Sequence, residues 1–295
     1  MPPIIVDRLI KSYDGTLAVH NLSFVVEPGR VTGFLGPNGA GKTTTMRILV
    51  GLVAPTIGTA TFGDLPYADL AHPQQTVGCV LEARFHPARS GRNHLRVLAP
   101  TAGASDRRVD DLLREVGLGG VARQPVGEYS MGMRQRLALA AAMLGDPDYL
   151  ILDEPANGLD PEGVSWVRRV LRAWADEGRT MLVASHVLAE VGQVVDRVVI
   201  IRAGRLVAEA EVADLTDSRV TVRVDRVDRM LNALRAAGAD HRLLADGAIR
   251  VTGRDTTEIG GIAARAGVTV TELAKQSAGA SLEAMFLDAI GGNGR

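Results

Sequence analysis

The fold of this chain is decided by one short stretch, Gly36-Pro37-Asn38-Gly39-Ala40-Gly41-Lys42-Thr43, which fits the pattern G-x-x-x-x-G-K-[ST]. The apolar run 31–35 before it predicts a buried strand, and residues 42–53 after it predict a helix. In this context the glycines let backbone N–H groups turn toward phosphate oxygens, and the start of the helix adds the positive end of its dipole. The stretch therefore predicts a phosphate-binding loop, and not an ordinary glycine-rich turn.

The side chains of this loop suggest individual roles. Lys42 is expected to reach the β- and γ-phosphates of a nucleotide, and Thr43 to offer its hydroxyl to Mg²⁺, while Thr44 would touch a nearer phosphate. The chain has only three lysines, Lys11, Lys42 and Lys275. A lysine at this place in the pattern therefore argues against a chance match.

A second stretch, Leu150-Ile151-Leu152-Asp153-Glu154-Pro155, predicts a buried strand that ends in two adjacent carboxylates. Ligands of open α/β sheets bind at the carboxyl ends of the strands. Asp153 is expected to hold Mg²⁺, directly or through water, and Glu154 to act as general base for an attacking water. Taken alone, such a strand end is more often simply solvated. Downstream of a phosphate loop, the catalytic interpretation is favoured.

Further along the chain, the pattern predicts two domains within its 295 residues. Short apolar strands alternate with helices up to about residue 217, which predicts a largely parallel α/β sheet with a helical segment at about 83–146. The remainder, 218–295, predicts the order β-α-β-β-α-β of a ferredoxin-like unit and then a terminal helix at 281–290.

Composition excludes several classes of protein. Hydrophobic residues make up 46% of the chain and the net charge is -1, so a sizeable core is expected and a dedicated nucleic-acid binder is not. The sole cysteine, Cys79, excludes an intrachain disulfide and lies in an apolar run that predicts a buried strand residue. The longest clean apolar run, 137–144, is shorter than the roughly 18 residues of a membrane span. We expect a soluble, cytoplasmic protein that meets a membrane only through a partner.

A third stretch, Tyr129-Ser130-Met131-Gly132-Met133-Arg134-Gln135-Arg136, resembles the signature motif of ATP-binding-cassette (ABC) proteins. Ser130 is also a natural helix N-cap, and a capped helix start attracts anions. The resemblance implies that Ser130 and Gly132 grip the γ-phosphate of a nucleotide held by the opposite subunit. Met131 stands in place of a glycine, and Met133 in place of a glutamine, which suggests a subfamily variant.

Three single residues extend the resemblance. Asp160 closes the segment 156–160, which resembles a loop that crosses the dimer interface. His186 follows an apolar strand and resembles the switch histidine that contacts the γ-phosphate. Tyr13 resembles the aromatic residue that stacks on adenine, with a plain surface tyrosine in a turn as an equal alternative.

Glu82 stands where ABC proteins usually have a glutamine that senses Mg²⁺ and the transmembrane partner. A glutamate there resembles one branch of drug- and antibiotic-resistance exporters, so Glu82 is a candidate nucleotide-site and metal residue. By the same resemblance, residues 85–98 would receive a coupling helix of the partner.

The resemblance covers roughly residues 3–215 and implies a P-loop NTPase fold of the ABC type. It implies an ATPase subunit of the daunorubicin-resistance or bacitracin type of multidrug exporter, using ATP and Mg²⁺. Such a subunit works as a homodimer or heterodimer with a separate permease at the cytoplasmic face of the membrane, with no direct nucleic-acid contact. Two alternatives stay open: a permease-independent cassette that acts on ribosomes or DNA, and a non-enzymatic ATP-binding regulator.

Overall fold

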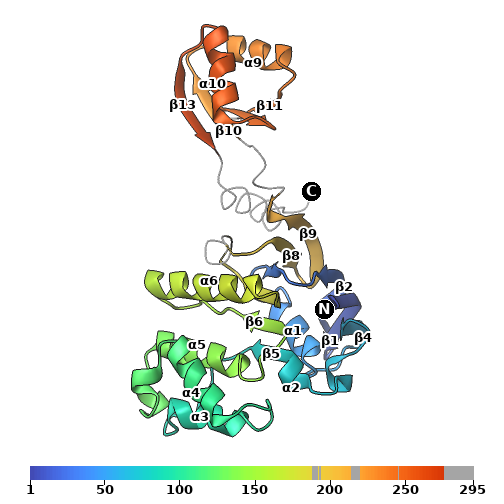
Figure 1. The fold of residues 1–295 in the computed structure, drawn as a ribbon. Coiled ribbons are helices and arrows are strands. Elements are labelled where there is room, and N and C mark those ends of the chain that lie inside the picture. Colours follow the sequence, from blue (N-terminus) through green and yellow to red (C-terminus); the bar gives the residue numbers. More distant parts are fainter. Residues whose placement is uncertain (188–191, 193, 214–219, 245, 276–295) are drawn as a thin grey trace. The chain divides into compact units, whose positions relative to one another are not determined.

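The computed structural model describes residues 1–187, 192, 194–213, 220–244 and 246–275. They form two compact units, the first within Met1–Ala210 and the second within Glu211–Met285 (Figure 1). The predicted boundary near 217 and the predicted helix 281–290 lie outside the described residues.

A six-stranded sheet forms the centre of the first unit, in the order β5-β6-β7-β3-β8-β9. The pairs β5–β6, β6–β7, β7–β3 and β3–β8 are parallel, as the sequence predicted. Their carboxyl ends therefore meet at one edge, which gathers the loops that follow β3, β5, β6 and β7. The strand bounds are β3 (Val31–Leu35), β5 (Val77–Val80), β6 (Tyr149–Asp153), β7 (Thr180–Ser185), β8 (Arg197–Arg202) and β9 (Arg205–Glu211).

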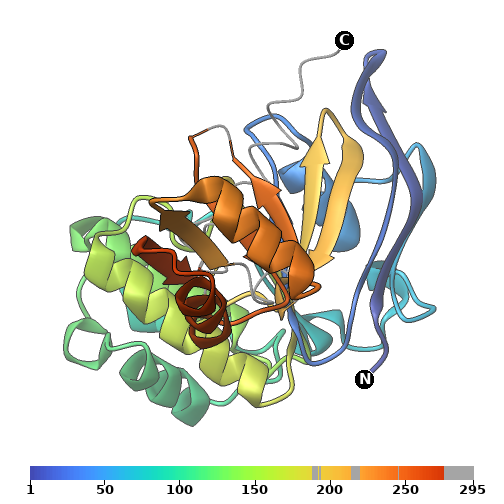
Figure 2. The ribbon, with the colours of Figure 1, turned by 90° about the horizontal axis from the view of Figure 1, so that it is seen from above.

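A second, antiparallel sheet has the order β2-β1-β4. It comprises β1 (Ile4–Tyr13), β2 (Thr16–Val26) and β4 (Ile57–Phe62). Its apolar face meets the central sheet, where the Phe24 and Phe34 rings stack with centroids 5.1 Å apart. In Figures 1 and 2, β1 and β2 lie along one side of the unit, away from the helical segment around α3 and α4.

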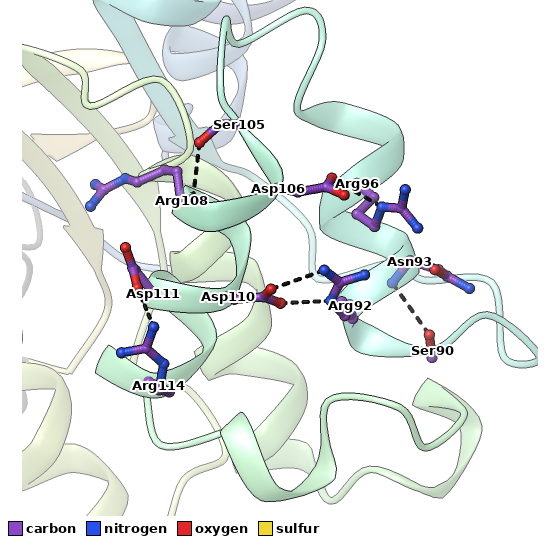
Figure 3. A network of polar contacts seen from close by, with 10 residues as sticks. All are labelled: Ser90, Arg92, Asn93, Arg96, Ser105, Asp106, Arg108, Asp110, Asp111 and Arg114. Carbon is purple, nitrogen blue, oxygen red and sulfur yellow. Dashed lines mark hydrogen bonds and ion pairs between the residues drawn. The ribbon is translucent and has the colours of Figure 1, made fainter.

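Six α-helices complete the described part of this unit: α1 (Lys42–Leu49), α2 (Pro73–Thr76), α3 (Gly91–Leu98), α4 (Asp106–Glu115), α5 (Met131–Ala142) and α6 (Pro161–Asp176). Ion pairs join α3 to α4 (Figure 3). The Arg92 guanidinium donates to both oxygens of Asp110, at 2.6 and 2.9 Å, and Arg96 Nε donates to Asp106 at 3.0 Å. Among the described residues, no helix is both long and apolar enough to cross a membrane.

The burial predicted for Cys79 is wrong, because its side chain is exposed. Cys79 lies on β5, an edge strand of the central sheet, where Val77 and Val80 are buried. An edge strand is covered less completely than a central one, and an apolar run alone does not reveal which strand lies at the edge.

The second unit has the predicted order of elements: β10 (Val220–Val224), α9 (Val227–Ala236), β11 (Asp240–Leu243), β12 (Ile249–Thr252), α10 (Thr256–Arg265) and β13 (Val270–Lys275). Its sheet order is β11-β12-β10-β13, with every neighbouring pair antiparallel. This is the ferredoxin-like arrangement. One apolar cluster, which includes Val222, Leu234, Ile249 and Ile262, forms its core.

A candidate nucleotide-binding site

The loop after β3 takes a shape that demands glycine. Gly41 caps α1 with a φ of 102°. A Cβ added to Gly41 would lie 2.5 Å from the Ala18 carbonyl oxygen. Side chains rarely adopt this backbone conformation, and the nearby backbone also leaves no room for one. The loop can therefore curl tightly in front of the first turn of α1, as a phosphate-binding loop must.

Lys42 is held inside this loop. Its side chain is only 6% exposed, and its Nζ donates to the Gly36 carbonyl at 2.6 Å. The same nitrogen lies 3.8 Å from Glu154 Oε1. Burial lowers the pKa of Lys42, while the carboxylates of Glu154 and Asp153 oppose that shift. The ammonium group is thus kept at the point where the loop faces the carboxylates.

The two carboxylates at the end of β6 have different partners. Thr43 Oγ1 donates to Asp153 Oδ2 at 2.6 Å. Burial raises the pKa of Asp153, and the hydrogen bond from Thr43 acts in the opposite direction. Asp153 Oδ1 and Glu154 Oε2 are buried and have no hydrogen-bond partner among the described residues. Such orphaned carboxylate oxygens need a cation or a donor from a ligand.

This donor set fits Mg²⁺. The ion prefers oxygen ligands and is often bound by one or two carboxylates together with substrate phosphates. Thr43 and Asp153 offer a hydroxyl and a carboxylate side by side. Among the described residues, no cluster of three His, Cys, Asp or Glu side chains could hold a metal without a further ligand. The remaining ligands would come from the nucleotide and water.

Glu154 is set at a special backbone position. Its φ is 50°, in the left-handed region, and its N–H donates to the Ala184 carbonyl at 3.0 Å. Non-glycine residues take this conformation at a cost, often at functional sites. The turn brings Glu154 Oε1 within 2.9 Å of His186 Nδ1, which follows β7. A general-base candidate and the histidine that could orient it are therefore in direct contact.

Most of these groups border a cleft of about 580 Å³, but Gly36, Pro37 and His186 are not part of its lining. Tyr13, whose ring is 44% exposed, belongs to its lining, and Lys11 Nζ lies 4.8 Å from the ring centroid. Asn157 also lines the cleft, and no motif in the sequence singles it out. It belongs to the segment 156–160 that follows the carboxylates, which was the available signal. The lining comprises Tyr13, Ala18, Asn38, Gly39, Ala40, Gly41, Lys42, Thr43, Thr44, Leu81, Asp153, Glu154 and Asn157.

The signature residues lie elsewhere in the unit. Ser130 caps α5 by accepting a hydrogen bond from Met133 N at 3.2 Å, and Asp160 caps α6 by accepting one from Gly163 N at 2.8 Å. Together with Gly132, they line a second hollow of about 220 Å³. This hollow, which we call the cap hollow, shares no lining residue with the cleft.

Glu82 is engaged by two arginines. Its carboxylate lies 2.8 Å from Arg47 Nη2 and 2.6 Å from Arg84 Nε. Glu82 is not part of the cleft lining, so its role at the metal stays a prediction. Arg47, on α1, also lowers the pKa of Asp153, although burial outweighs this contribution. The sequence pattern had not connected Arg47 with the site.

Comparison with known proteins agrees with this geometry. The family model described as ABC transporter matches residues 19–157, and one described as Domain of unknown function (DUF8746) matches 218–283. The bacitracin transport ATP-binding protein BcrA of Enterococcus faecalis is 35% identical, over 98% of this chain and 96% of its own. The Nod factor export ATP-binding protein I of Burkholderia pseudomallei (strain 1710b) is 38% identical, over 74% of each chain. A solved ATP binding subunit of an ABC transporter superposes with a TM-score of 0.65 at 29% identity, over 72% of this chain and 91% of its own.

The chain therefore belongs to the ABC transporter family. Within that family it is an ATP-binding subunit and an ATPase, whose fold is the P-loop cassette followed by a small ferredoxin-like unit.

Proposed function

We propose that this subunit uses ATP hydrolysis to drive export of a drug, an antibiotic or another amphipathic compound through a separate membrane permease. The similarity to the bacitracin transport protein supports this, because it extends over almost the whole of both chains and so includes the second unit. The relative named for Nod factor export supports the outward direction.

In the reaction, the residues of the cleft position water and stabilise charge. Glu154 takes a proton from the attacking water, and His186 holds the Glu154 carboxylate in place through the 2.9 Å contact. Lys42 neutralises charge on the β- and γ-phosphates. Mg²⁺, held through Thr43 and Asp153, supplies further positive charge on the phosphates when bound. The products are ADP and inorganic phosphate.

Two subunits, identical or different, enclose each nucleotide head to tail. The observation that carries this proposal is the separation of the cleft from the cap hollow within one chain. Because Ser130 and Gly132 line the cap hollow and not the cleft, we assign them to the γ-phosphate of a nucleotide held by an opposite subunit. Their helix start offers N–H groups and a positive dipole end to an anion. Binding of ATP would therefore close the dimer, and hydrolysis would open it.

The permease would contact the segment 85–98. A hollow of about 590 Å³ there is lined by His86, Ala88, Arg89, Asn93, Arg96 and Val97. The Val97 side chain is 57% exposed, which suits a partner with an apolar contact face. Through such a partner, the subunit would lie at the cytoplasmic face of the membrane. We expect no direct contact with nucleic acid.

The test is to purify the tagged full-length chain from membranes of its native host in mild detergent and to identify the copurifying proteins by mass spectrometry. We expect a polytopic membrane protein in near-equal amount. A parallel preparation of Arg89→Ala/Val97→Ala, altered only in the proposed contact segment, should retain less of it. Recovery of ribosomal or DNA-repair proteins instead, with the chain in the soluble fraction, would overturn the transport proposal and leave the ATPase chemistry intact.

A further inference from the structure

The segment just before α6 lies against the start of α5 within the first unit. A Cβ added to Gly158 would lie 2.4 Å from Met131 Sδ, and one added to Gly132 would lie 3.7 Å from Leu159 Cδ2. The residues just before α6 therefore touch the first turn of α5. Both helix starts, capped by Ser130 and Asp160, open into the cap hollow.

The two helix starts differ in charge. Each start carries the positive end of a helix dipole and unpaired backbone N–H groups. At the start of α6 the Asp160 carboxylate caps the helix and Glu162 lies in the first turn, whereas the first turn of α5 holds no acidic residue. Contacts between α5 and α6 set the spacing of these two starts in the free subunit.

One such contact lies one turn further along α5. The guanidinium carbon of Arg136 lies 4.4 Å from the centroid of the Trp166 ring on α6. The same guanidinium donates to the Val116 carbonyl at 3.4 Å. Among the described residues, no carboxylate forms an ion pair with Arg136, which is half-buried in the lining of the cap hollow. Its cation is therefore held by an aromatic face and a carbonyl, and its charge still acts on the hollow.

The chain has two tryptophans, and both connect α6 to the helical segment. Trp166 stacks with Arg136 of α5, and the indole N–H of Trp174 donates to Glu115 Oε1 of α4 at 3.4 Å. Trp174 is 2% exposed and belongs to the core. Trp166 is only partly covered, so its contact with Arg136 can be altered without emptying the core.

We propose that the Arg136–Trp166 stack is a positioning contact, which holds the capped starts of α5 and α6 at a fixed spacing so that both meet the nucleotide of an opposite subunit together. This inference rests on the proposed head-to-tail dimer. It assigns Arg136 and Trp166 no contact with the nucleotide bound in their own cleft. Losing the stack should therefore weaken dimer closure and leave the affinity of a single subunit for ATP unchanged.

The experiment uses the full-length chain with Glu154→Gln, which is designed to bind ATP without turnover. Into this background we place Trp166→Leu and Arg136→Met, which remove the ring or the cation. Trp166→Phe and Arg136→Lys keep an aromatic face or a cation, and Arg107→Met removes an exposed cation from α4 as a control for net charge. The dissociation constant of the ATP-loaded dimer is measured by sedimentation velocity. ATP affinity is measured on dilute, monomeric protein.

We expect Trp166→Leu and Arg136→Met to weaken the dimer about tenfold, the order of magnitude expected from losing a cation–π contact in both subunits. Trp166→Phe and Arg136→Lys should each keep most of the dimer affinity. The dimer dissociation constant of Arg107→Met should stay within about twofold of that of the Glu154→Gln chain. If the Glu154→Gln chain without further changes fails to dimerise with ATP, the proposed dimer is overturned, and so is the positioning role. If the Glu154→Gln chain dimerises with ATP, and adding Trp166→Leu does not weaken that dimer, the positioning role alone is overturned. A loss of ATP affinity by the monomers of Trp166→Leu and Arg136→Met would overturn it as well.

Discussion

The cleft and the cap hollow differ in how far a single chain completes them. In the cleft, side chains from α1, β6 and the loop after β7 already contact one another. Thr43 donates to Asp153, and Glu154 lies between Lys42 and His186. The buried oxygens that remain unpaired there belong to the two carboxylates. A single chain thus brings together the side chains to which we assign the reaction.

In the cap hollow, the two N-cap side chains are occupied by their own helices. Ser130 and Asp160 each accept a hydrogen bond from the first turn that they cap, and Arg136 lies on Trp166. Glu162 also lines this hollow, and no histidine or lysine accompanies it in the lining. We therefore propose that the chemistry takes place in the cleft and that the cap hollow recognises another subunit. Substitutions in the cleft and substitutions in the cap hollow should therefore impair different properties of the protein.

The largest effect should come from Glu154→Gln. The amide keeps the size of the side chain but cannot take a proton from water, so we expect phosphate release to fall about a thousandfold, within the range for a lost general base. ATP affinity should persist. The same change at Glu177, an exposed carboxylate paired with Arg179, serves as the control. Turnover equal to that of the unmodified protein would remove Glu154 from its proposed role.

Two single substitutions, one in the cleft and one in the cap hollow, distinguish the roles of these two sites directly. Lys42→Ala removes a buried cation from the cleft and should weaken ATP binding about a hundredfold, as expected for a charge-assisted contact of roughly 3 kcal/mol. Ser130→Ala should leave ATP affinity of the monomer unchanged and weaken the ATP-loaded dimer about tenfold. It should also lower stability by about 1 kcal/mol through the lost cap. Titration with a fluorescent ATP analogue and sedimentation velocity measure the two quantities. If both variants lost ATP affinity equally, the division between cleft and cap hollow would be wrong.

The sequence predicted residues that the structure brings together in the cleft, because their patterns are local. A phosphate loop needs glycines and a lysine at fixed spacing. The two carboxylates are adjacent in the chain at the end of β6, so they stay together whatever the position of β6 in the sheet. The strand β4 is not predicted, although its burial alternates. Its more buried face carries Gly58, Ala60 and Phe62, while the apolar Ile57 lies on the exposed face, so the hydropathy of the sequence alternates only weakly.

Features that depend on tertiary packing could not be predicted. The pairing of Glu82 with Arg47 joins positions 35 residues apart, and the stack of Arg136 on Trp166 joins two helices. Neither pair forms a pattern along the chain. The exposure of Cys79 follows from the order of strands in the sheet, which local composition does not encode.

The smallest effect should appear in the stability of the free subunit. Burial raises the pKa of Asp153 above that of the unfolded chain, so the folded state binds this proton more readily. The stabilisation from protonated Asp153 is therefore present at acid pH and is lost as the pH rises through the folded-state pKa. At pH 8 the ionised, partly unpaired carboxylate destabilises the nucleotide-free protein.

Asp153→Asn removes that charge while keeping the shape of the side chain. We expect it to raise the melting temperature of the nucleotide-free protein by about 2 °C at pH 8 and by less at pH 5, where the native residue is closer to neutral. Calorimetry at the two pH values measures this difference, with the exposed Asp64→Asn as the control. A gain of equal size at both pH values would show that the buried charge is not its cause. The unpaired charge of Asp153 would then not destabilise the nucleotide-free protein. The left-handed backbone of Glu154 would be the next feature to test as a source of lower stability.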